Sequence, residues 1–264
     1  MIQPTLFFEA ILAVVSAGVY FYVGRVLLKR RPSTPEAGTA WFMFVVWWYA
    51  LAATTLSGAI LSLLGALGIA GLPVFTTITL MNLLATCVAL YGLMFYLLYL
   101  YTGNPRLLGP LAVFYIAYYA FLIYYVLASD PVRVAVNRWG AGLVYQNEIR
   151  GPLFFIALFL LVFPQIIGSL AYFMLYFQVR TATQKYRILL VSWSIIIWFL
   201  SSFLARLAGL SGQDWWQVTS RLIALAASLT ILMAYQPPSW VKRQFGVMAI
   251  ADEQTSPQLL QERS

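Results

Sequence analysis

Residues 6–31 read LFFEAILAVVSAGVYFYVGRVLLKRR, and this stretch decides the class of fold. The run from Leu6 to Leu28 exceeds the roughly 20 residues that a helix needs to cross the hydrocarbon core of a membrane. Three cations, at positions 29–31, follow the run, whereas residues 1–4 before it carry none. This order is typical of a stop-transfer flank rather than of a cleaved signal peptide, and it predicts that the N-terminus lies outside.

The rest of the chain repeats this composition. Of its 264 residues, 62% are apolar or aromatic and only 9% carry charge, against about 25% charged in an ordinary soluble domain. The runs are continuous rather than alternating, which favours helices over an outer-membrane barrel. We therefore expect an all-α, seven-transmembrane-helix bundle over residues 1–235 and a short basic, polar tail over 236–264. The predicted spans are 6–28, 40–70, 76–101, 108–128, 152–177, 188–207 and 221–235.

The distribution of Lys and Arg predicts the orientation of the bundle, because cytoplasmic loops carry the excess of cations. One side has ten of them: Arg25, Lys29, Arg30, Arg31, Arg106, Arg180, Lys185, Arg187, Lys242 and Arg243. The other side has five: Arg133, Arg138, Arg150, Arg206 and Arg221. We therefore expect the N-terminus outside and the C-terminus in the cytoplasm. The net charge of +8 then serves orientation and contact with anionic lipids, so nucleic acid is not an expected partner.

Most catalytic chemistry is excluded by composition. The chain has no histidine, eight acidic residues and one cysteine, Cys87, so no His/Cys cluster can hold a metal and no histidine can act as a general base. The last span has no lysine, which excludes a retinal Schiff base. We expect no enzymatic activity and no cofactor.

Small residues predict where the helices touch, since helices in lipid associate by close packing. Gly58, Ser62, Ala66 and Ala70 form a stripe along one face of the second span. We interpret it as packing within the bundle, with a homodimer face as the alternative. Tryptophans near span ends read as interface anchors: Trp47, Trp48, Trp139, Trp215, Trp216 and Trp240. Trp193 and Trp198 lie deeper and are candidates for a core or pocket wall.

Two regions are candidate binding sites. Within the bilayer, Pro164 predicts a hinge in the fifth span, and Gln165 beside it and Asn82 in the third span are polar groups at depth. On the outer face, a cationic and aromatic rim is the hypothesised receptor for an amphipathic or anionic ligand. Its residues are Arg138, Trp139, Arg206, Trp215, Trp216 and Arg221. Helix capping and contact with lipid headgroups are the alternative role of this rim.

The layout resembles the seven-helix sensor domains at the N-termini of some bacterial histidine kinases and cyclases. The residues that carry the resemblance are Arg180 to Arg187, the helix from Arg221 to Gln236, and the exit Pro237-Pro238-Ser239-Trp240, with its basic and aromatic continuation. The resemblance implies sensing of a ligand or of the membrane state in a prokaryotic plasma membrane. This chain has no kinase or cyclase module, so a partner protein would have to carry the output.

Two alternatives remain. Pro164-Gln165 is similar to the proline–glutamine pair of the PQ-loop transporters, although the first span lacks the matching pair because Gln3-Pro4 is reversed. The second alternative is that the chain is a non-catalytic subunit of a larger respiratory or photosynthetic membrane complex.

Overall fold

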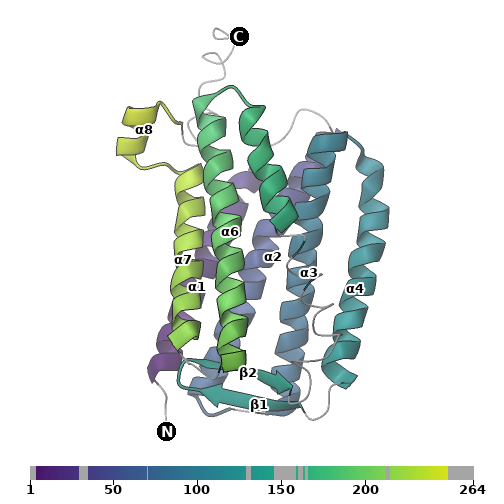
Figure 1. Ribbon diagram of the computed structural model, residues 1–264, viewed down its shortest axis with the longest axis vertical. Coiled ribbons are helices and arrows are strands. Elements are labelled where there is room, and N and C mark those ends of the chain that lie inside the picture. The colour runs from purple at the N-terminus through teal and green to yellow at the C-terminus, as the bar shows by residue number, and fades with distance from the viewer. Residues whose placement is uncertain are drawn as a thin grey trace.

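A computed structural model shows a bundle of long helices with a β-hairpin across one end (Figure 1). The structure describes residues 4–29, 35–69, 71–128, 132–145, 159, 163, 166–211 and 215–248. Within them the long helices are α1 (Pro4–Leu28), α2 (Pro35–Ala66), α3 (Leu72–Thr102), α4 (Leu108–Ala128), α6 (Ala182–Ser211) and α7 (Trp215–Tyr235). A short α8 (Ser239–Phe245) and two 3-10 turns, Pro105–Leu107 and Leu175–Phe177, complete the helical part.

Five segments in the described part of the chain are long and apolar enough to cross a membrane. They are Pro4–Leu28, Ala37–Ala66, Leu72–Thr102, Pro105–Ala128 and Val218–Tyr235. The helix α6 is 30 residues long but more polar at its start, and a shorter apolar helix covers Ile166–Phe177. The predicted helical bundle with several apolar helices of membrane-spanning length is thus confirmed, whereas the count of seven spans and the orientation stay predictions.

The helix ends differ from the predicted spans where backbone signals outweigh hydropathy. The helix α2 ends at Ala66 rather than at 70, because Gly68 has a positive φ of 74°. The amide of Ile69 donates to the carbonyl of Leu64 at 2.9 Å, which completes a left-handed helix cap. The helices α6 and α7 both begin six residues before the spans expected at 188 and 221. Of the predicted fifth span, 152–177, the structure describes residues 159, 163 and 166–177.

The hairpin is a feature that the predicted loop 129–151 did not anticipate. Strand β1 (Val132–Asn137) pairs antiparallel with β2 (Gly140–Tyr145), with Asn137 opposite Gly140. It lies across the bundle end where α1 begins and α2 ends (Figure 1). A Cβ at Gly65 would come within 2.6 Å of the Cβ of Ala141, so the hairpin packs directly on the α2 backbone.

The core is aromatic and is centred on α2, which corrects the interpretation of two tryptophans as interface anchors. The side chain of Trp48 is 0% exposed and that of Trp47 is 4% exposed, and both pack in the central cluster with Phe44 and Tyr20. The small stripe of α2 is a packing face at Ser62 and Ala66, which are buried, whereas its last predicted member, Ala70, lies outside the described residues. Trp139 lies at the hairpin turn, and Trp240 is exposed on α8.

The helices α1 and α7 run parallel, so they begin at the same end of the bundle. Near their starts Arg221 is bonded to Glu9, and near their ends Gln236 donates a hydrogen bond to the hydroxyl of Tyr22. The chain then turns into α8. The residues that follow α8 contact α6, because Arg187 on α6 donates a hydrogen bond to the carbonyl of Met248 at 2.9 Å. The hairpin and α8 therefore mark opposite ends of the bundle (Figure 1).

Candidate functional site

An ion pair joins α1 and α7 at the end of the bundle where the hairpin lies. The Nε of Arg221 on α7 donates to Oε1 of Glu9 on α1, and the carboxylate is buried, whereas the side chain of Arg221 is 29% exposed. The second carboxylate oxygen, Oε2, has no hydrogen-bond partner among the described residues. We call Glu9, Arg221 and the adjoining Gly58 the charged junction.

Gly58 makes room for the guanidinium group. A Cβ at this position of α2 would lie 3.2 Å from Nη2 and 3.7 Å from Nη1 of Arg221. The two amino groups therefore rest against the bare backbone of α2. Three helices meet at one charge pair, and the predicted small stripe is what admits the arginine between them.

The turn of the hairpin lies close to this junction. The hydroxyl of Thr5 is bonded to the carbonyl of Arg138, and Thr5 precedes Glu9 by one turn of α1. Arg138 also places its guanidinium carbon 5.8 Å from the ring centroid of Trp139, which is a cation–π distance. The structure thus brings Arg138, Trp139 and Arg221 to the beginning of α1, and their role as a ligand-binding rim stays a prediction.

The other predicted site residues do not share one place in the described structure. The amide Nδ2 of Asn82 donates to the carbonyl of Thr54 at 2.7 Å and so ties α3 to α2, and its ligand role stays a prediction. Pro164 and Gln165 lie outside the described residues, and their hinge and ligand roles stay predictions. Arg206 belongs to α6, and Trp215 and Trp216 belong to the first turn of α7; the structure describes their backbone only.

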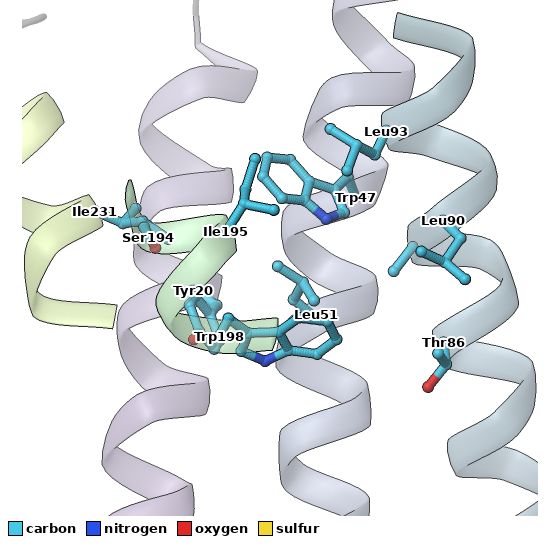
Figure 2. Close-up of a pocket in the computed structure, with 11 residues that line it drawn as sticks. Tyr20, Trp47, Leu51, Thr86, Leu90, Leu93, Ser194, Ile195, Trp198 and Ile231 are labelled. Carbon is cyan, nitrogen blue, oxygen red and sulfur yellow. The ribbon is translucent and has the colours of Figure 1, made fainter. Parts of the chain in front are cut away.

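A separate cavity lies deeper between α1, α2, α3, α6 and α7 (Figure 2). Aromatic walls come from Tyr20, Trp47 and Trp198, and Thr86 and Ser194 contribute hydroxyls; leucine, isoleucine and alanine side chains close the rest. The volume open to the centres of water molecules is about 20 Å³. The cavity therefore has room for one or two waters or for a molecule of a few heavy atoms. We call it the Tyr20 cavity.

The sequence indicated only part of this cavity. Trp198 forms a wall as predicted, whereas Trp193, the other deep candidate, is 53% exposed on the bundle surface. Trp47, whose position predicts an interface anchor, is instead a wall of the cavity, and Tyr20 is a lining residue that no motif in the sequence indicates. The available signal was the position of Tyr20 well inside an apolar run, where a hydroxyl needs a partner.

In the part of the chain that the structure describes, no group of three or more His, Cys, Asp or Glu side chains is arranged to hold a metal ion. Comparison with protein-family models, with curated proteins and with solved structures finds no match. The function is therefore inferred from the residues and their contacts alone.

Proposed function

We propose that the chain is a seven-span, receptor-like protein of a prokaryotic plasma membrane, with the hairpin outside and α8 in the cytoplasm. It binds an amphipathic anion at the charged junction and passes the change to a partner protein, without enzymatic activity of its own. The ten-to-five bias of Lys and Arg supports this orientation. The parallel course of α1 and α7, with the hairpin and α8 at opposite ends, is consistent with it.

The buried Glu9–Arg221 pair carries the proposal. Ionisable groups inside a membrane segment are costly and mark functional positions by default. A buried ion pair is weak evidence for stability, since well-packed apolar residues often replace it without loss. The presence of this pair between α1 and α7 is explained if the ion pair breaks and re-forms during function.

The ligand would act by competing with Glu9 for Arg221. A carboxylate or phosphate can engage the planar guanidinium through two parallel hydrogen bonds, which Glu9, bonded through Nε alone, does not make. The indole of Trp139 at the hairpin turn offers an apolar surface to the rest of such a ligand. Release of Glu9 frees α1 from α7, and α7 leads directly into α8 on the cytoplasmic side.

The test measures binding of dodecanoate and dodecyl phosphate to the full chain in nanodiscs by native mass spectrometry. Dodecanol serves as the neutral control ligand. Glu9→Gln should bind the anions about tenfold more tightly because the competitor is gone, whereas Arg221→Gln should lose them. The double variant Glu9→Gln/Arg221→Met removes the pair without stranding a charge, so it should fold normally and bind no better than it binds dodecanol. Equal affinity of all variants, or preference for dodecanol, refutes the proposal.

Orientation is tested separately by single-cysteine labelling in whole cells. Arg138→Cys in the hairpin should react with an impermeant maleimide from outside, and Gln244→Cys in α8 only after permeabilisation. The native Cys87 is buried and gives little background. Labelling of both sites from one side overturns the topology and the receptor role with it.

A transport role is the second candidate, and the Tyr20 cavity favours it because it lies between the first three and the last two helices. Transport predicts uptake of solute into liposomes, and an accessory subunit predicts a stoichiometric complex on purification from native membranes. A receptor shows neither uptake nor a requirement for a large complex.

A further inference from the structure

The short helix α8 is held in one orientation by contacts within it and after it. Seven residues are too few for a helix to persist in water alone, so packing against the rest of the chain must stabilise it. Val241 within α8 is 2% exposed, and Val247 just after it is 3% exposed. Both backbone groups of Met248 bond to α6: its amide donates to Oγ1 of Thr183 at 3.2 Å, and its carbonyl accepts from Nη2 of Arg187 at 2.9 Å. The helix therefore presents a fixed face to its surroundings.

That face is aromatic. The side chain of Trp240 is 59% exposed and that of Phe245 is 55% exposed, although both lie close to the buried Val241. At about 100° per residue, these three residues fall within one sector of roughly 140°, and Lys242 and Arg243 fall within the opposite sector. We call Trp240 and Phe245 the aromatic face of α8 and Lys242 and Arg243 its cationic face. A helix with these two faces is suited to the boundary between an apolar and a polar phase.

The position and charge of α8 match the surface of a membrane. It follows α7, whose segment Val218–Tyr235 is long and apolar enough to cross a membrane, so the end of α7 brings α8 to the level of the headgroups. Figure 1 shows α8 projecting beyond the outline of the bundle rather than covering its end. Neither residues 236–248 nor residues 178–190 at the start of α6 contain an acidic residue, so this region is purely cationic in sequence.

We infer that α8 lies on the membrane surface and binds anionic lipid headgroups. The aromatic face enters the boundary between headgroups and acyl chains, where tryptophan is favoured, and the cationic face attracts the phosphates. The bonds from α6 to Met248 fix the rotation of α8 about its axis and so keep the aromatic face toward the lipid. This contact does not depend on the anion-binding role of the charged junction, because Arg221 lies at the other end of α7.

The orientation of α8 is tested by spin labelling of the full chain in nanodiscs that contain phosphatidylcholine and phosphatidylglycerol. A nitroxide is attached at Gln244→Cys, between Trp240 and Val241 around the helix, or at Ser239→Cys, in the sector of the cationic face. The native Cys87 is buried. The ratio of collisions with oxygen to collisions with a water-soluble nickel complex should be severalfold higher at position 244 than at 239. Trp240→Ser/Phe245→Ser should remove this difference.

The role of charge is tested by raising the phosphatidylglycerol content from zero to one third. The immobilised component of the label at position 244 should grow at the expense of the mobile component, and 0.5 M NaCl should reverse the effect. Lys242→Gln/Arg243→Gln should weaken the response about fivefold for each cation, or about thirtyfold together. The matched control is Arg25→Gln/Lys29→Gln, which removes two exposed cations of α1 at the same end of the bundle and should leave the response unchanged.

Three results overturn the inference. Equal exposure of both labels to the nickel complex means that α8 lies in water, with its aromatic face open to a protein partner instead. No response of the wild-type protein to phosphatidylglycerol means that the cations do not bind lipid. A response that Lys242→Gln/Arg243→Gln retains means that the lipid acts elsewhere on the chain. Binding of dodecanoate at the charged junction is measured separately and is unaffected by any of these outcomes.

Discussion

Replacing Gly92 by alanine tests the packing of α2 against α3, on which the Tyr20 cavity depends. A Cβ at position 92 would lie 2.6 Å from the backbone carbonyl oxygen of Met43 and 3.2 Å from the amide nitrogen of Trp47. Ordinary contacts of a Cβ begin at 3.4 Å. Because the neighbouring atoms are backbone, no side-chain rotation relieves the clash, and α2 and α3 must separate by about 0.8 Å, the difference between 3.4 and 2.6 Å.

The magnitude follows from two opposing effects. Overpacking of a tight contact costs about 1–3 kcal/mol. Alanine in place of glycine within a helix returns about 0.5–1 kcal/mol through the entropy of the unfolded chain. The net destabilisation should be about 1 kcal/mol, roughly a fivefold shift toward the unfolded state.

The assay is the unfolding midpoint in mixed micelles with rising SDS, followed by circular dichroism. The matched control is Gly18→Ala in α1, where a Cβ would meet nothing within 4 Å. This variant gains the entropic term without the clash, so the two variants should differ by about 1–3 kcal/mol. Gly92→Ala protein as stable as Gly18→Ala protein would show that α2 and α3 are not in such close contact.

Three further predictions concern other contacts. Asn82→Ala removes the hydrogen bond to the Thr54 carbonyl and should lower the free energy of unfolding by about 0.6–2 kcal/mol, measured in the same titration; an unchanged midpoint argues against the contact. Gly65→Val should displace Ala141 and lift the hairpin, so trypsin should cut the hairpin arginines faster while the helices stay protected; unchanged cleavage contradicts the packing. Cys87 is only 3% exposed, so its thiol should resist a membrane-permeant maleimide until the protein is unfolded, whereas rapid labelling of native protein would show that α3 is not buried there.

Much of the candidate site could not be predicted from the sequence. Glu9 and Arg221 are 212 positions apart, and each was visible only as an isolated charge near the end of a span. Trp47 and Trp48 were interpreted as interface residues, because hydropathy does not distinguish a lipid-facing indole from a core indole. Trp198 was recognised by its depth in its span, which is a local property. The hairpin could not be predicted, because its strands are short and their burial comes from the helix ends beneath them.

The helical structure, the membrane-spanning length of several helices and their approximate positions could be predicted from the sequence, because they follow from the length and polarity of continuous segments. The face of each helix that turns inward could not be predicted in this way, because it is set by contacts between helices that are distant in the chain. Helices such as α1 and α3 are apolar on all sides. Because lipid is as apolar as the neighbouring helices, hydrophobicity does not indicate which face makes contact. Close packing at Gly58, Gly65 and Gly92 sets that choice, and with it the charged junction and the Tyr20 cavity.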